Sequence, residues 1–288
     1  MQSFTLEFDR FRLELGSNAC IMGILNATPD SFSDGGRFNT VETAVAQGLK
    51  LAKEGAHILD IGGESSRPFA EPVSEQQELD RVIPVIEALS KQINIPISID
   101  TVKARVAREA LKAGASIIND ISALERDPDM VRLAAQTKAP VILMHMRGTP
   151  QTMQVNPGYT DLMLEITSYL SARASFAMEH GIEKDRIILD PGIGFGKTVE
   201  HNLVLIRHLD KICGLGFPVL MGPSRKSFIQ NILSGKEQAS IGPDHIKTEH
   251  GTLAAVAASL MNGAHIVRVH DVKNVRIFTH IIDSIRNA

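Results

Sequence analysis

Eight short apolar runs alternate with stretches of helical periodicity, and this pattern is the strongest constraint on how the 288-residue chain folds. A short, continuous apolar run is typical of a strand that is buried on both faces. Strands that alternate with helices predict a parallel sheet. The predicted strands are residues 20–25, 57–61, 97–100, 116–120, 141–145, 187–190, 218–222 and 266–269.

The stretches between these runs carry apolar residues at helical spacing. One helix begins at Ser74, which is placed to form a capping box with Gln77. The other predicted helices are residues 40–54, 102–113, 129–138, 161–180, 198–209, 250–261 and 275–285. Eight such units predict an α/β fold, the TIM (β/α)8 barrel. An open doubly wound sheet is the alternative, but it usually has fewer strands and a nucleotide fingerprint in its first turn, which this chain lacks.

Residues 4–15 alternate apolar and polar side chains around Asp9 and Arg10, which predicts an antiparallel β-hairpin. Because the hairpin precedes the first buried strand, we expect it to close one end of the barrel. A chain of this length is common for a barrel with one domain. We therefore expect residues 1–288 to form a single domain, with the hairpin in residues 1–18 and the barrel in residues 19–288.

The charge distribution excludes several classes of partner. The net charge of −3, with both signs scattered, provides no basic stripe for nucleic acid and no polybasic segment for a membrane. No apolar run approaches the roughly 18 residues of a membrane span, and the charged N-terminus does not read as a signal peptide. Cys20 and Cys213 lie in apolar contexts, which favours a reducing compartment without disulfides. We expect a cytoplasmic protein.

Two patterns resemble functional motifs without matching them. Residues 191–198 end in the letters GKT, but a phosphate-binding P-loop requires a glycine where Pro191 stands. Several histidines suggest a metal site, yet they fall in different elements and no pair has the H-x-x-x-H spacing of a helical site. We interpret them as surface or hydrogen-bonded residues; they are His57, His145, His180 and His201.

Polar residues follow most of the predicted strands. The carboxyl ends of barrel strands meet at one mouth, so these side chains should be neighbours. Each alone is as well explained as a helix cap, but six at one mouth favour a site. Carboxylates with an amide suit a flat heterocycle that carries N–H and NH₂ groups on its edges. The six residues are Asn26, Asp60, Asp100, Asn119, Asp190 and His270.

Basic residues are expected at the same mouth. Arg268 and His270 are two positions apart on one strand, so they share a face. Unless they form only a solvated rim, such cations suit an anionic leaving group such as phosphate or pyrophosphate. A Mg²⁺ ion on Asn26 and the phosphate oxygens also fits, because Mg²⁺ usually takes few protein ligands. The basic residues are Arg67, Arg225, Lys226, Arg268 and His270.

Four stretches resemble the motifs of dihydropteroate synthases. They are MGILNATPDSFSDGG (residues 22–36), DIGGESSRP (60–68), DPGIGFGK (190–197) and GPSRKS (222–227). This family uses a TIM barrel to join 6-hydroxymethyl-7,8-dihydropterin pyrophosphate to p-aminobenzoate, which forms 7,8-dihydropteroate for folate synthesis and releases pyrophosphate. The resemblance runs from about Cys20 to the C-terminus. The chain departs from it at Ser66, where threonine is usual, although serine keeps the hydroxyl.

The resemblance implies a role for each matching residue. It implies that Asn26 binds Mg²⁺, and that the catalytic residues are Asp100, Lys226, Arg268 and His270. It implies pterin contacts by Asp100, Asn119, Asp190 and Lys226, pyrophosphate contacts by Arg67, Arg268 and His270, and p-aminobenzoate contacts by Phe32, Ser66, Pro68 and Ser227. Further implied substrate contacts are Thr28, Asp60, Phe195 and Gly222. The usual barrel geometry instead predicts a phosphate site after the seventh strand.

The resemblance also implies a homodimer that sulfonamides, as mimics of p-aminobenzoate, inhibit. A pterin-dependent methyltransferase is the alternative function. It has no pyrophosphate to hold, so it should lack the features at residues 65–68 and 224–227, which this chain has. A non-catalytic pterin-binding barrel should lack some of the strand-end residues, and all of them are present.

Overall fold

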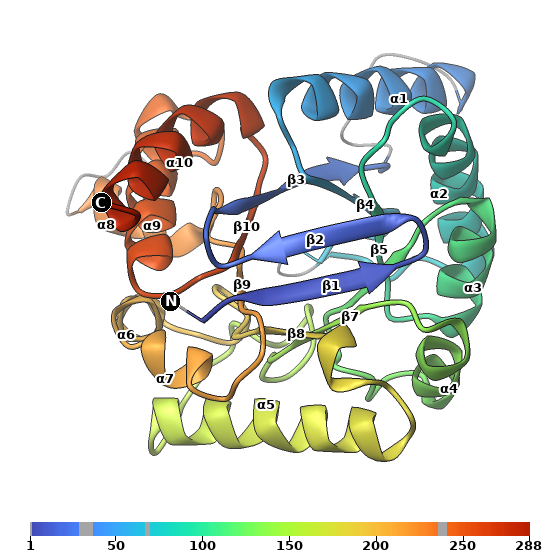
Figure 1. The fold of residues 1–288 in the computed structure, drawn as a ribbon. Coiled ribbons are helices and arrows are strands. Elements are labelled where there is room, and N and C mark those ends of the chain that lie inside the picture. Colours follow the sequence, from blue (N-terminus) through green and yellow to red (C-terminus); the bar gives the residue numbers. More distant parts are fainter. Residues whose placement is uncertain (1, 29–36, 67–69, 236–240) are drawn as a thin grey trace.

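The computed structural model describes residues 2–28, 37–66, 70–235 and 241–288 (Figure 1). Within these residues, eight parallel strands form a barrel, which confirms the predicted TIM-barrel fold. The order around the barrel is β8-β7-β6-β5-β4-β3-β10-β9, and a parallel bridge between Leu189 and Val219 joins the two ends. The strands are β3 (Cys20–Asn26), β4 (Ile58–Gly62), β5 (Ile97–Asp100), β6 (Ile117–Asp120), β7 (Val141–Met144), β8 (Ile187–Asp190), β9 (Leu220–Met221) and β10 (Ile266–Val269).

Helices surround the barrel (Figure 1). They are α1 (Arg37–Glu54), α2 (Glu75–Ser90), α3 (Ala104–Ala113), α4 (Pro128–Thr137), α5 (Leu162–Glu179), α6 (Val199–Arg207), α7 (Asp210–Cys213), α8 (Ser227–Ser234), α9 (Ile246–Met261) and α10 (Val272–Arg286), with a 3-10 turn at Lys184–Arg186. The capping box of Ser74 and Gln77 is present at the start of α2. None of the helices described here is both long and apolar enough to cross a membrane.

Two helical predictions need correction. The predicted helix ranges do not include α8, because its eight residues are too few to show a clear period. The helix predicted over residues 198–209 ends at Arg207, and the separate short helix α7 follows it. Neither difference moves a strand, because both changes lie in the outer layer of helices.

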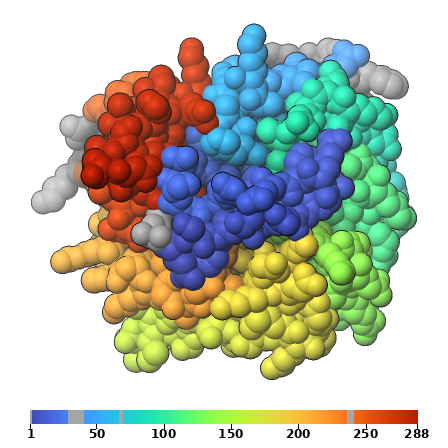
Figure 2. Space-filling view, in the orientation of Figure 1, coloured from blue at the N-terminus to red at the C-terminus, as the bar shows by residue number. Residues whose placement is uncertain are grey.

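The predicted hairpin is also confirmed. Strand β1 (Phe4–Phe8) pairs antiparallel with β2 (Phe11–Leu15), and the hairpin lies across one end of the barrel (Figures 1 and 2). Its side chains form one buried cluster with the inward-facing residues of the strands; the cluster consists of Leu6, Phe8, Leu15, Cys20, Met22, Ile58, Ile117, Ile142, Ile188, Leu220 and Ile266. The hairpin therefore supplies the floor of the barrel interior.

The strand period of two residues determines what lies above this floor. Side chains two positions apart on a strand point to the same side. The residue two positions after each floor residue therefore also faces the interior, nearer the carboxyl ends of the strands. On five of the strands that residue is Asp60, Asn119, Met144, Asp190 or Arg268. The interior thus changes from apolar to largely polar within one step.

The hairpin floor provides a stability test. Leu6 is 1% exposed, whereas the neighbouring Glu7 has a side chain that is 67% exposed. We expect Leu6→Ala to lower the free energy of unfolding by about 2–5 kcal/mol, because it leaves a cavity in the floor. Glu7→Ala should change it by less than about 0.5 kcal/mol. Urea denaturation measures both, and equal effects of the two substitutions would show that the hairpin is not part of the core.

Candidate active site

Arg268 lies at the centre of the polar layer. Its Nε donates a hydrogen bond to Asp60 Oδ2 at 2.5 Å, and its Nη2 donates to Asp100 Oδ2 at 2.7 Å. The amide of Asn119 donates to the same Asp60 oxygen at 3.1 Å. The guanidinium group thereby links strands β4, β5 and β10 inside the barrel, and Asp60 adds β6 through Asn119.

Burial sets the ionisation of this layer. It raises the pKa of Asp100, and the negative charge of Asp60 adds to the rise, while Arg268 opposes it. Burial lowers the pKa of Arg268, but the charges of Asp60 and Asp100 outweigh this effect and raise it above its ordinary value. Arg268 therefore stays charged, whereas Asp100 accepts a proton more readily than an ordinary aspartate.

Asp190 at the end of β8 is held by its own loop. Its Oδ1 accepts a hydrogen bond from the backbone N–H of Gly192 at 2.7 Å. Burial raises its pKa to about 6, although the Gly192 N–H and the charges of Lys226 and Arg268 oppose the rise. Asp190 is therefore a buried carboxylate that is largely ionised at neutral pH, among cations that do not fully offset the cost of burial.

A cavity of about 350 Å³ adjoins these groups. Carboxylates, an amide, cations and apolar side chains surround it, which is the combination expected for a flat, polar-edged ligand. Lys226 Nζ lies 3.9 Å from the centre of the Phe195 ring, a cation–π contact at the cavity wall. The lining residues are Ser66, Asp100, Asn119, Ile121, Met144, Asp190, Ile193, Phe195, Gly222, Lys226 and Arg268.

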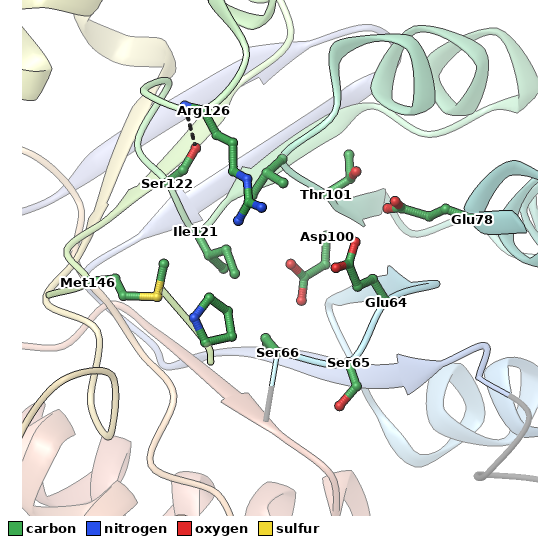
Figure 3. Close-up of a pocket in the computed structure, with 12 residues that line it drawn as sticks. Glu64, Ser65, Ser66, Glu78, Asp100, Thr101, Ile121, Ser122, Arg126 and Met146 are labelled. Atoms are coloured by element: carbon green, nitrogen blue, oxygen red, sulfur yellow. Dashed lines mark hydrogen bonds between the residues drawn. The ribbon is translucent and has the colours of Figure 1, made fainter. Parts of the chain in front are cut away.

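A second cavity of about 460 Å³ adjoins the first, since Ser66, Asp100 and Ile121 line both. The carboxylates of Glu64 and Glu78 lie on its Thr101 side, opposite Met146 (Figure 3). Both carboxylates accept hydrogen bonds from one ammonium group, that of Lys103, at 2.5 Å each.

Lys103 also donates to the carbonyl of Val73 at 2.9 Å. Burial lowers its pKa, but the bonds to Glu64 and Glu78 outweigh that effect and raise it. Lys103 therefore joins the start of the segment between β4 and α2 to its end.

The structure brings most of the predicted site residues together, but not all. Eight of them line the first cavity: Ser66, Asp100, Asn119, Asp190, Phe195, Gly222, Lys226 and Arg268. Asp60 is fully buried and lines neither cavity, so its visible role is to hold Arg268 and Asn119. Phe32, Arg67 and Pro68 lie outside the described residues.

The remaining predictions lie at the rim. Nδ1 of His270 lies 3.0 Å from Ser224 Oγ, which also accepts the backbone N–H of His270 at 3.3 Å. Ser227 is exposed at the first residue of α8, and Thr28 is partly buried just after β3. Arg225 forms ion pairs with Asp244 and Glu249, so it does not supply a free cation to the site; the distances are 2.5 and 2.6 Å.

Asn26 offers the donor set that the Mg²⁺ prediction requires. It is partly exposed at the end of β3, and its side-chain amide forms no hydrogen bond with another described residue. No group of three or more His, Cys, Asp or Glu side chains in the described part of the chain is arranged to hold a metal ion. A single amide oxygen fits a Mg²⁺ that takes its other ligands from phosphate and water.

Sequence reasoning missed three apolar lining residues, Ile121, Met144 and Ile193. Strand parity could have identified Met144, which follows the floor residue Ile142 by two positions. The contacts of Lys103 carried no such signal, because its partners lie 25 to 39 positions away in the sequence.

The raised pKa of Asp190 predicts how stability depends on pH. The folded protein keeps this proton up to about pH 6, whereas the unfolded chain releases it near pH 4. Ionisation of Asp190 therefore lowers stability progressively as pH rises through this window. Asp190→Asn removes the charge and keeps an oxygen for the Gly192 N–H.

At pH 7.5, Asp190→Asn should accordingly be more stable than the native chain, by at most about 3 kcal/mol. Near pH 4 the difference should vanish. Urea unfolding at both values measures this, with the exposed Asp185→Asn as the control, which should change little. A less stable Asp190→Asn at pH 7.5 would show that the carboxylate stabilises the fold.

Comparisons with known proteins find relatives that match the chain over almost its whole length. The model of the pterin binding enzyme family matches residues 22–270. The dihydropteroate synthase of Synechocystis sp. is 50% identical over 270 residues, which are 94% of this chain and 91% of that protein. The structure of the Yersinia pestis dihydropteroate synthase in complex with a sulfonamide drug has a TM-score of 0.90 and 41% identity, covering 99% of this chain and all of that one.

A second solved structure is equally similar. The dihydropteroate synthase of Xanthomonas albilineans with 4-aminobenzoic acid has a TM-score of 0.90 and 44% identity, and each chain is covered completely. The chain therefore belongs to the pterin-binding enzyme family, and within it to the dihydropteroate synthases.

Proposed function

We propose that this chain condenses 6-hydroxymethyl-7,8-dihydropterin pyrophosphate with p-aminobenzoate to give 7,8-dihydropteroate and pyrophosphate, a transferase reaction of folate biosynthesis. One observation carries the proposal: the cavity of about 350 Å³ gathers Asp100, Asn119, Asp190, Lys226 and Arg268 around one space. Relatives that are 43–50% identical are dihydropteroate synthases, which supports the same reaction here.

The pterin ring fits the buried part of this cavity. Asp190 and Asn119 present an acceptor and an amide to the N–H and NH₂ groups along the ring edge. A carboxylate that binds such donors in a desolvated cavity forms charge-assisted hydrogen bonds. Phe195 and Met144 provide the apolar wall on which a flat ring packs.

The bond that breaks joins the pterin methylene to the pyrophosphate oxygen. Positive charge grows on the methylene, where the Asp100 carboxylate stabilises it, and negative charge grows on pyrophosphate, where Arg268 and His270 stabilise it. Asn26 would hold Mg²⁺, which when bound supplies further charge neutralisation at the phosphates. The aniline nitrogen of p-aminobenzoate is already nucleophilic near neutral pH, so the reaction needs no strong general base.

We place p-aminobenzoate at the edge of the same cavity. Ser66 and Lys226 line it, and Ser227 begins α8 beside Lys226. We assign these residues, with Phe32 and Pro68, to the p-aminobenzoate site, and expect sulfonamides to compete there. Known structures of relatives include one with 4-aminobenzoic acid and one with a sulfonamide drug, which supports these two kinds of ligand for this chain.

The site also weighs against the alternative function, a pterin-dependent methyltransferase. Such an enzyme has no pyrophosphate to bind, whereas Arg268, which we assign to pyrophosphate, borders the cavity here. The curated relatives are also synthases rather than methyltransferases.

The decisive experiment is direct. The protein, mixed with the pterin pyrophosphate, p-aminobenzoate and Mg²⁺, should produce 7,8-dihydropteroate in a chromatographic assay.

Asp190→Asn should weaken pterin binding at least tenfold, because a charge-assisted hydrogen bond contributes roughly 1.5–3 kcal/mol. Calorimetry measures this, with Asp185→Asn as a surface control. Absence of product from the native protein would overturn the proposed reaction, and unchanged affinity would remove Asp190 from the pterin site.

We also propose that one pterin-binding domain, made of hairpin and barrel, forms a homodimer. Helix α10 exposes four apolar side chains on one face, namely Ile277, Phe278, Ile281 and Ile285, which are 59%, 44%, 57% and 60% exposed. Such a stripe suits an interface between two copies of the chain. A cytoplasmic location stays a prediction from the sequence.

The dimer is tested by light scattering with size-exclusion chromatography. Ile281→Glu places a charge in the proposed interface and should convert dimer to monomer. Leu164→Glu, on α5 at a different side of the barrel (Figure 1), changes an equally exposed apolar residue and should leave the mass unchanged. A monomeric native protein, or a dimeric Ile281→Glu, would contradict the proposal.

A further inference from the structure

Lys197 is a buried lysine that the proposed reaction does not use. It lies in the loop after β8 and is only 3% exposed. No carboxylate of the described residues lies within 4 Å of its ammonium nitrogen. Burying a cation without an ionic partner costs free energy unless other polar groups replace its water. Its hydrogen-bond partners are therefore informative.

Those partners belong to two different loops. Nζ donates to the carbonyl of Phe195 at 2.9 Å and to that of His145 at 3.4 Å, and it lies 3.0 Å from His145 Nδ1. Three acceptors match the three N–H groups of an ammonium. His145 directly follows β7, whereas Phe195 belongs to the loop after β8, so Lys197 fastens the two loops to each other.

The charge states are consistent with this arrangement. Burial, together with the charge of Lys197, lowers the pKa of His145 to about 3, so the imidazole is neutral and Nδ1 can accept a hydrogen bond. Burial lowers the pKa of Lys197 to about 7, while the carboxylate of Asp190 opposes that shift.

The two loops touch closely around Lys197. Gly192 has φ = +69°, and a Cβ atom there would lie 1.9 Å from the carbonyl oxygen of His145. The hydroxyl of Tyr159, beyond β7, donates to the carbonyl of Gly196 at 2.9 Å. The hydrogen bonds of Lys197 therefore join two loops whose backbones are already in close contact.

The junction adjoins the pterin cavity. Phe195, whose carbonyl Lys197 holds, lines the cavity and carries the ammonium of Lys226 over its ring. Met144, next to His145, lines the same wall. Lys197 therefore bonds to Phe195 itself and to His145, the residue that follows Met144 in the chain.

We propose that Lys197 is a positioning residue for the pterin site: its hydrogen bonds to His145 and Phe195 fix the β7 and β8 loops so that Phe195 and Lys226 face the pterin ring. This inference rests on the proposed pterin site. It goes beyond that site because it gives Lys197, which does not line the cavity, a role in the affinity for the pterin. Lys197 acts through Phe195, so its loss should matter only while Phe195 is present.

The test is calorimetry of 6-hydroxymethylpterin with Lys197→Met, which keeps the length of the side chain and removes its N–H groups. We expect affinity to fall about tenfold, the scale of a hydrogen bond from a charged group. Lys184→Met makes the same change at an exposed site and should bind like the native chain. In steady-state assays the change should appear mainly in KM for the pterin substrate rather than in kcat.

A double-mutant cycle separates positioning from general loss of structure. In a Phe195→Leu background, Lys197→Met should weaken binding less than about twofold, because residues that act through one another are not additive. Equal losses in both backgrounds would overturn the inference, as would unchanged affinity in Lys197→Met. Failure of the native protein to bind the pterin would instead overturn the proposed function.

Should Lys197→Met not fold, substitutions of His145 decide the question. His145→Asn keeps an acceptor near the position of Nδ1, whereas His145→Leu removes it. We expect the asparagine variant to bind the pterin within about threefold of the native chain, and the leucine variant to bind roughly tenfold more weakly. Equal affinities of the two variants would show that the bond to Lys197 does not position the site.

Discussion

The alternation of side chains along parallel strands is the constraint on which the site depends. In a closed barrel every second side chain of each strand faces the interior. The apolar floor residues Ile58, Ile188 and Ile266 therefore dictate that Asp60, Asp190 and Arg268, two positions later, face the same interior. A shift of one position in any strand would exchange a core residue with a functional one. The site is thus tied to the hydrophobic core by backbone geometry.

That geometry places charged groups in a buried layer. The buried cation in this layer has ion-pair partners, whereas one of the buried carboxylates has none within the described part of the chain. Arg268 is bonded directly to two carboxylates and its pKa rises. Asp190 has cations nearby but no ion pair within 4 Å among the described residues, and its pKa rises to about 6. An acid held this way costs stability in the absence of ligand. Binding sites commonly hold such strain, since groups arranged for a ligand are not arranged for the fold.

Most of the fold can be predicted from the sequence because the same pattern, an apolar run with a polar end followed by a helix, occurs eight times. Eight apolar runs with polar ends indicate a barrel even though individual boundaries shift by a few residues, as at β9. Helix α8 lacked such a signal, since a segment of eight residues shows hardly two helical turns. The polar layer was predictable from strand ends.

The contacts within the site were harder to predict. Asp60 looked like a ligand contact, and only the structure shows it buried beneath Arg268. Lys197 belongs to the stretch that only resembles a P-loop, and His145 is one of the scattered histidines, so the sequence suggests no role for either residue. A hydrogen bond that joins two loops 52 positions apart leaves no trace in the spacing of residues.

The choice of arginine at position 268 follows from the number of bonds the residue must form. The guanidinium has five N–H groups in a planar fork, and its bonds to Asp60 and Asp100 use two of them. The other three have no hydrogen-bond partner within the described residues, so they remain for an anion. A lysine would have to divide three N–H groups of one nitrogen between two carboxylates and a phosphate, without the planar fork. Arginine can therefore keep both carboxylates paired and still offer N–H groups to the proposed pyrophosphate, so the two halves of the site need not compete for one cation.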